Sequence, residues 1–161
     1  SRAVLSVLDG EYALSQGPLD DYGRRLALGA DEMRPDLDAV IAMRSTGWSV
    51  SRLNAVDRNL LRLALYEMLC VDEVDVAVTI DECVELAKAY GTDESSRFVN
   101  GLLGRVADDL DTGVDVIAKA REAARERAAA QAEKDAGAEK DVEPQADASG
   151  DAAPSDGEDA E

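Results

Sequence analysis

Apolar positions concentrate between Asn54 and Arg105 and predict three consecutive helices there. From Val56 to Leu69, apolar residues fill more positions than one helix face holds, so this stretch predicts a helix surrounded by other helices. Residues 80–88 follow the period of an amphipathic helix. Thr79 and Glu82 have the spacing of a capping box, which predicts that this second helix begins there.

The third predicted helix begins near Ser95 and places its apolar residues on one face through Val106. Gly101 and Gly104 lie one turn apart on it. They predict a strip of bare backbone that a neighbouring helix approaches closely.

Helical spacing also precedes the central stretch. Leu19–Met33 has the spacing of one helix, and Pro35 opens another that ends at Gly47. Trp48 then has the position of a packing anchor, and Asn54 that of an N-cap. With only 4% aromatic residues, the core must consist of aliphatic side chains, so we expect an all-α fold, a compact helical bundle.

Composition changes after this bundle and predicts three regions. Residues 1–110 form the packed helical domain, and 111–134 are rich in alanine and charge with almost no apolar stripe, which predicts a solvated helix. Residues 135–161 contain ten acids and one lysine, or half of the net charge of −18, and predict a disordered acidic tail. Such a tail favours solubility and screens out unspecific polyanions, and it is also able to compete with RNA for a basic surface.

Candidate chemistry is sparse. The chain has no histidine, which excludes histidine-dependent catalysis, and it has no phosphate-binding loop or CxxC pair. A solvated helix face explains the carboxylates of Asp81, Glu82 and Glu85, so we expect no enzyme activity, no metal and no cofactor. Cys70 and Cys83 are expected to be buried free thiols. The sequence shows neither an apolar run of membrane-spanning length nor a signal peptide, so we expect a cytoplasmic protein.

Three motifs carry a resemblance to a known family: AVDRNLLRLALYEML, VAVTIDECVELAKAYG and SSRFVNGLLGRV. In this order and at these separations they resemble the transcription antitermination factor N-utilisation substance protein B (NusB). The resemblance covers roughly Leu19 to Val106. It implies an all-helical protein that binds a boxA-type single-stranded leader RNA together with ribosomal protein S10 (NusE), within an RNA polymerase antitermination complex that supports ribosomal RNA synthesis.

The candidate RNA-binding residues lie at the start of the third helix: Ser95, Arg97, Phe98 and Asn100. An aromatic ring stacks on unpaired bases, an amide reads a base edge, and an arginine at a helix N-terminus meets phosphate. Phe98 alone is more often a core residue. The resemblance gives an RNA role equal weight, because similar proteins use this region to hold RNA.

The resemblance also implies a surface for ribosomal protein S10, with an acidic residue at the start of the central helix. The matching residue is Asp57, and the other polar positions on that helix are Arg58, Arg62 and Glu67. Asp57 also suits the positive end of the helix dipole, and Arg62 and Glu67 suit an ordinary helix surface. A homodimer is a further possibility.

The main difference from the family is at the N-terminal end of the sequence, where family members carry an arginine-rich helix and this chain shows none. Either the sequence lacks its true N-terminus, or its lineage dispensed with that helix. In the second case RNA binding weakens, apolar surface is exposed, and the alternative function is a non-enzymatic module that binds S10 or forms a homodimer. A basic run could replace the missing patch: Lys119, Arg121, Arg125 and Arg127.

Overall fold

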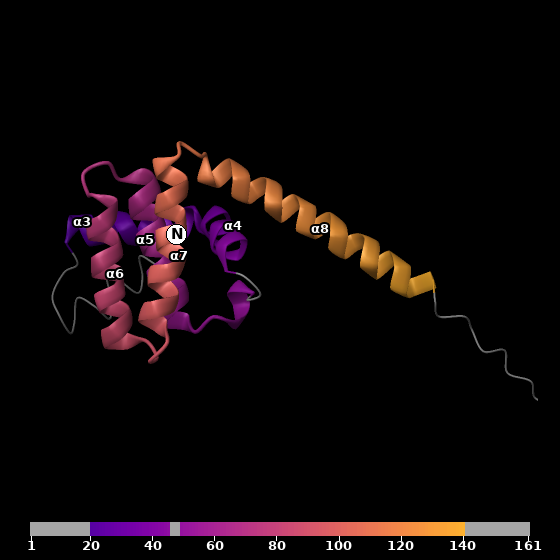
Figure 1. Cartoon of the computed structure of the whole chain (residues 1–161), viewed down its shortest axis with the longest axis horizontal. Coiled ribbons are helices and arrows are strands. Elements are labelled where there is room, and N and C mark those ends of the chain that lie inside the picture. Colours follow the sequence, from indigo (N-terminus) through magenta and orange to yellow (C-terminus); the bar gives the residue numbers. More distant parts are fainter. Residues whose placement is uncertain (1–19, 46–48, 141–161) are drawn as a thin grey trace, which may run out of the picture. The chain divides into compact units, whose positions relative to one another are not determined.

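The computed structural model describes residues 20–45 and 49–140, with side chains through 136, and in these ranges it is all-helical. This confirms the predicted all-α class. The elements, shown in Figure 1, are α3 (Asp21–Glu32), α4 (Arg34–Arg44), the 3₁₀ turn η2 (Val50–Arg52), α5 (Ala55–Cys70), α6 (Val76–Tyr90), α7 (Ser95–Asp111) and α8 (Val116–Lys140).

Helix α5 is the centre of the packed part, as its sequence predicted. It contacts α3, α4, α6 and α7, and its Leu61 and Leu65 are fully buried. A helix with apolar residues on most faces is stable only when several neighbours cover it. The fully buried partners from other helices are aliphatic: Leu37, Val40, Ile41, Ala87, Val99, Leu102, Leu103, Val106 and Ala120.

The N-terminus of α5 has the predicted cap, and that of α6 does not. The Asn54 side chain accepts a hydrogen bond from the Asp57 backbone N–H at 2.8 Å. At α6 the cap is Asp75, whose carboxylate accepts from the Ala77 N–H at 2.8 Å, so the helix begins at Val76. The prediction of a capping box at Thr79 was wrong, because Asp75 already caps the helix one turn earlier and Thr79 is buried inside it.

The turn from α6 to α7 is tight and sets where α7 begins. A Cβ atom on Gly91 would lie 2.5 Å from the Ser95 side chain and 2.6 Å from the Ala87 carbonyl oxygen, so only glycine fits. The Thr92 N–H donates to the buried Ser95 hydroxyl at 2.8 Å. This closed turn holds the first residues of α7 in a fixed position.

The predicted close helix approach at Gly101 and Gly104 is wrong. Among the described residues, no neighbouring atom lies within 4 Å of the Cβ position of either glycine. The close approach occurs instead between α3 and α5, where a Cβ on Gly29 would lie 2.0 Å from Cζ of Tyr66. Helical spacing alone did not reveal which glycine faces a neighbour.

The first turns of α8 pack onto the bundle, although the sequence predicted a solvated helix. Val116 and Ala120 are 2% and 0% exposed, and Arg121 makes two hydrogen bonds of 2.7 and 2.6 Å to the Asp36 carboxylate of α4. A positive φ of 73° at Gly113 turns the chain between α7 and α8. The sequence did not predict this contact, because two apolar residues of small or medium size are too few to give an amphipathic pattern.

The chain divides into two compact units, Ser1–Arg127 and Ala128–Glu161. Helix α8 continues through Lys140, so residues 135–140, expected to be disordered, are helical. The boundaries predicted at 110 and 134 remain a prediction. The predictions for the N-terminal segment, for Trp48 and for the rest of the acidic tail concern residues outside the described ranges.

Both cysteines are free thiols, as predicted, and the burial differs from the prediction only at Cys70. Cys83 is buried and its pKa is raised to about 12, chiefly by that burial, whereas Cys70 is exposed at the end of α5.

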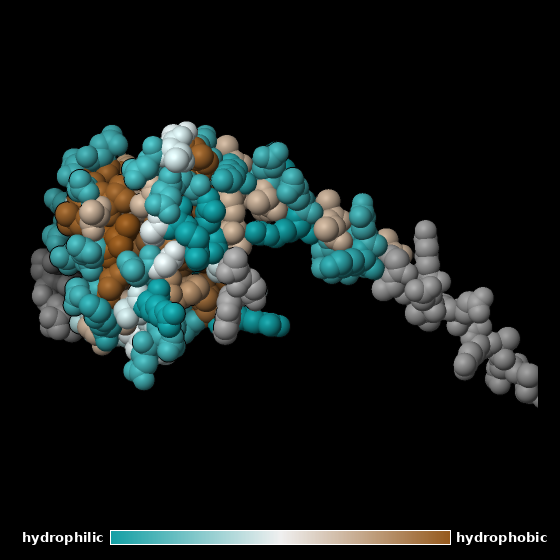
Figure 2. Space-filling view, viewed as in Figure 1, coloured by the Kyte–Doolittle hydropathy of each residue, from teal (hydrophilic) through white to brown (hydrophobic). Residues whose placement is uncertain are grey.

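Hydrophobic surface also remains along α6 (Figure 2), where Val78, Leu86 and Tyr90 are exposed. Within the described ranges, no helix has the length and apolar character needed to cross a membrane.

Candidate functional site

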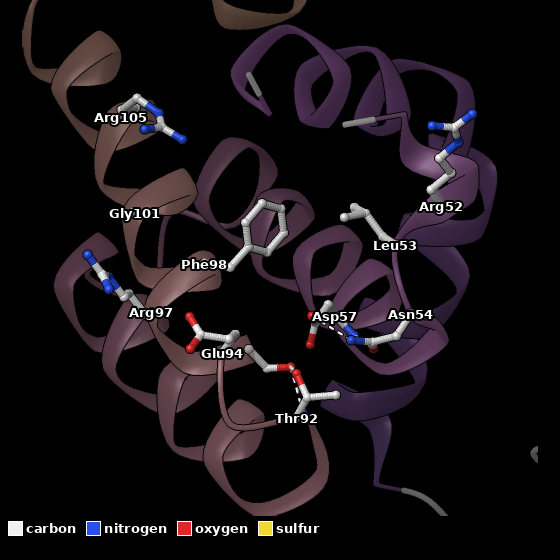
Figure 3. A pocket seen from close by; sticks show the side chains of 11 residues that line it. Arg52, Leu53, Asn54, Asp57, Thr92, Glu94, Arg97, Phe98, Gly101 and Arg105 are labelled. Atoms are coloured by element: carbon white, nitrogen blue, oxygen red, sulfur yellow. Dashed lines mark hydrogen bonds between the residues drawn. The ribbon is translucent and has the colours of Figure 1, made fainter. Parts of the chain in front are cut away.

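A cavity of about 610 Å³ opens between the start of α5, the α6–α7 turn and one face of α7. Figure 3 shows its wall from close by. Its lining combines an aromatic ring, an aliphatic side chain, three arginines and two carboxylates: Arg52, Leu53, Asn54, Asp57, Thr92, Glu94, Ser95, Arg97, Phe98, Gly101 and Arg105.

One wall of the cavity is a single strip of α7. Arg97, Gly101 and Arg105 are spaced four residues apart, and Phe98 lies beside them. With 3.6 residues per turn, this spacing brings all four to one face of the helix. Phe98 is half-buried and packs against the core from the cavity side, so its ring contributes to both.

The arginines surround the opening from two sides. Arg97 and Arg105 come from α7, and Arg52 comes from η2 across the cavity (Figure 3). Arg105 also donates a hydrogen bond of 2.9 Å to the Arg44 carbonyl oxygen, which holds its guanidinium against the end of α4. In a chain with a net charge of −18, this local grouping of cations is the kind of basic patch that an anionic ligand requires.

Asp57 brings a buried carboxylate to the same cavity. It is only 5% exposed, and its Oδ2 accepts a hydrogen bond of 2.7 Å from the Asn54 amide. Its Oδ1 is buried without a hydrogen-bond partner among the described residues. Since an unpaired buried carboxylate oxygen is costly, Oδ1 is a candidate acceptor for a donor that a ligand brings.

Only some of the predicted RNA-binding residues are placed in the structure so that they could contact RNA in the cavity. Arg97 and Phe98 line the cavity, as an RNA role requires. Ser95 lines it too, but the residue is only 1% exposed and its hydroxyl is hydrogen-bonded to the backbone and hydroxyl of Thr92, so its role here is to close the turn. Asn100 is exposed on α7 outside the cavity lining.

The predicted partner-binding residues do not form one surface. Asp57 lies in the cavity wall, and Arg58 donates a hydrogen bond of 3.3 Å to the nearby Leu53 carbonyl oxygen. Arg62 makes two hydrogen bonds of 2.8 Å to the Asp38 carboxylate and thereby joins α5 to α4. The fourth residue, Glu67, faces another helix.

Glu67 accepts a hydrogen bond from the Tyr22 hydroxyl and joins α5 to α3. Partial burial and the Glu67 carboxylate together raise the pKa of Tyr22 to about 12. Arg62 and Glu67 therefore connect helices within the bundle, and this leaves Asp57 and Arg58 near the cavity.

Seven residues that line the cavity were not among the predicted site residues: Arg52, Leu53, Asn54, Thr92, Glu94, Gly101 and Arg105. Arg105 carried a signal, because it lies two turns beyond Arg97 on the same helix face. Arg52 and Leu53 carried none, because they lie more than 40 positions away and only the packing of η2 near α7 brings them to the site.

The basic run on α8, which could replace the missing RNA-binding patch, is partly engaged in ion pairs within the bundle. Arg121 is paired with Asp36, and Lys119 lies 3.4 Å from the Asp109 carboxylate. Arg125 and Arg127 are exposed. In the described part of the chain, no group of three or more side chains is arranged to hold a metal ion.

Comparison with known proteins gives a single family. The model of the NusB family matches residues 5–108. The transcription antitermination protein NusB of Carboxydothermus hydrogenoformans is 52% identical over 93 residues, which is 58% of this chain and 65% of that protein. The protein of the same name from Rubrobacter xylanophilus is 47% identical over 103 residues, or 64% of this chain and 74% of that protein.

Solved structures agree with this match. T. maritima NusB aligns with a TM-score of 0.54 and 45% identity, covering 55% of this chain and 63% of that one. A chain from a structure described as a plectonemic RNA supercoil aligns with a TM-score of 0.59 and 26% identity, covering 63% and 77%. The match thus covers only part of the length of these proteins. It spans 65% of the Carboxydothermus hydrogenoformans protein, 63% of the T. maritima chain and 53% of the curated relative from Salinispora arenicola.

Proposed function

This chain belongs to the NusB family, whose curated members are transcription antitermination proteins, and on this premise we propose that it binds single-stranded RNA through the cavity described above. The RNA is a boxA-type leader element, bound together with ribosomal protein S10. The complex acts on RNA polymerase to support ribosomal RNA synthesis. The protein works by binding and carries out no covalent chemistry.

The observation that carries this proposal is the pairing of Phe98 with three surrounding arginines in one cavity. An aromatic face stacks on any unpaired base, and guanidinium groups contact the phosphates on either side of it. The similarity to a chain from a structure described as an RNA supercoil also supports a nucleic-acid ligand. Glu94 lines the same cavity and opposes anion binding, so we expect the affinity for RNA alone to be modest.

Asp57 is the residue we propose for the contact with ribosomal protein S10. Its unpaired Oδ1 is an acceptor for an arginine or lysine of a basic partner. Because Asp57 is buried, that donor has to enter the cavity or displace its edge. The partner and the RNA would then share one composite site, which fits a factor that binds RNA better as a pair.

The test is a fluorescence anisotropy titration of a short labelled boxA-type RNA with this chain, with and without ribosomal protein S10. We expect saturable binding that weakens with salt, strengthens with S10 and is strongly reduced in Phe98→Ala. Asp57→Asn keeps the shape of the side chain and should weaken S10 binding at an unchanged melting temperature. Arg62→Gln is not used, because it breaks a bond between two helices.

One outcome of this titration would contradict RNA binding. If S10 associates with the chain but RNA binds under neither condition, the proposed RNA function is wrong. The chain would then act as a protein-interaction module, which is the alternative function. If RNA binds and Phe98→Ala has no effect, RNA binding is real but the cavity is the wrong site.

A further inference from the structure

None of the described residues gives Gly101 a structural reason to be glycine. It lies in the interior of α7, where glycine is less favourable than alanine because it loses more backbone entropy on folding. A Cβ there would meet no atom of the described residues within 4 Å, and the helical backbone needs no positive φ at this position. Packing and backbone geometry among the described residues therefore leave the absent side chain unexplained.

The position of Gly101 in the cavity supplies a reason. It lines the wall between Arg97 and Arg105, one turn from each, and it follows Phe98 by three residues. At 1.5 Å per residue, the two arginines are about 12 Å apart along the helix, with bare backbone between them. Across the same cavity, Asp57 has a buried oxygen without a hydrogen-bond partner among the residues that the structure describes, which is an independent sign that a ligand completes this site.

We infer that Gly101 keeps this wall flat so that the sugar–phosphate backbone of bound single-stranded RNA lies directly against α7. Phosphates on either side of the contact meet Arg97 and Arg105, and the base between them reaches Phe98. A side chain at Gly101 would stand between the two guanidiniums and hold the strand away from both. This inference rests on the proposed function and adds a positioning residue to it.

Gly104 is the matched control for Gly101. It lies on the same helix, and in the described part of the chain it too has no neighbouring atom within 4 Å of its Cβ position, but it does not line the cavity. Alanine at either position should raise or preserve the melting temperature, because alanine favours the helix and meets no obstacle. The two substitutions should differ only in RNA binding.

The experiment compares the parent chain with Gly101→Ala, Gly101→Gln, Gly104→Ala, Gly104→Gln and Phe98→Ala. Affinity for the short labelled RNA is measured by anisotropy at several salt concentrations, and each variant is checked by thermal denaturation. We expect Gly101→Ala to lower the affinity about fivefold or more, as an inserted methyl group does in a close-packed contact, and Gly101→Gln to lower it further. The Gly104 variants should stay within about twofold of the parent, since ordinary surface substitutions away from a site have small effects.

Equal affinities of Gly101→Gln and the parent would overturn the inference while leaving the proposed function intact. An equal loss in the Gly104 variants would also overturn it, because the effect would then belong to the helix and not to the cavity. Weaker binding of S10 with unchanged RNA binding in Gly101→Ala would assign the flat wall to the protein partner and reject the RNA contact. If the parent does not bind RNA, the proposed function fails and this inference fails with it. If RNA binds and Phe98→Ala binds as the parent does, the cavity is the wrong site and this inference fails while RNA binding stands.

Discussion

Arg97→Gln is the most informative single substitution at the cavity, because it tests whether this cation meets a phosphate. Arg97 lines the opening, and its side chain makes no hydrogen bond or ion pair with any of the described residues. Its removal should therefore leave the fold unchanged. Arg125→Gln is the control, because it changes the net charge equally at an exposed position outside the cavity lining, and a smaller salt slope in this variant would instead favour the basic run on α8.

The magnitude follows from the number of arginines at the opening. If Arg52, Arg97 and Arg105 each neutralise one phosphate, the slope of log affinity against log salt is about −2.1 for a single strand. Between 50 and 200 mM salt the parent then loses affinity about 18-fold. With one contact removed, the slope becomes about −1.4 and the loss about 7-fold.

The assay is an anisotropy titration of the short RNA at four salt concentrations with the parent, Arg97→Gln and Arg125→Gln. We expect Arg97→Gln to bind more weakly at low salt and to approach the parent as salt rises, while Arg125→Gln keeps the slope of the parent. A slope that is the same in Arg97→Gln and the parent would refute the phosphate contact. An equal decrease in both variants would show that the RNA senses only the overall charge.

Three further substitutions test the ring, the core and the docking of α8. Phe98→Leu keeps an apolar side chain against the core, so we expect a nearly unchanged melting temperature with RNA affinity lowered about fivefold or more by the lost stacking. Gly29→Ala places a methyl group 2.0 Å from the Tyr66 ring and should lower the free energy of unfolding by about 1–3 kcal/mol in urea denaturation, and an unchanged midpoint would contradict the close approach. Arg121→Gln removes the partner that holds the pKa of Asp36 below its usual value, so the parent should melt above the variant near neutral pH. That difference should disappear as the pH falls through the lowered pKa of Asp36, because protonation removes the ion pair in the parent too.

The helices followed from local pattern wherever the pattern was strong. The apolar positions of Val56–Leu69 predicted a central helix, and α5 is central. Asn54 predicted a cap and provides one. These features depend on residues within one or two turns of each other, so the sequence alone contains them.

The errors arose where two interpretations were locally equal. Thr79 and Asp75 both have side chains that can cap a helix, and in the structure Asp75 is the residue that caps α6. Gly101 and Gly29 both offered bare backbone inside a helix, and the packing of α3 on α5 used Gly29. At Val116 and Ala120 the apolar signal was too short to predict a docked helix.

The candidate site shows the same division. Arg97 and Phe98 belong to the motif SSRFVNG, so the sequence by itself determined that an aromatic ring and a cation begin α7 together. Only the tertiary structure decided that Arg52 and Asp57 join them in one cavity, that Asn100 does not, and that Gly101 faces the opening. The reason is physical. Periodicity determines which residues share a helix face, whereas the faces that meet across a bundle depend on how all the helices pack, which no local pattern contains.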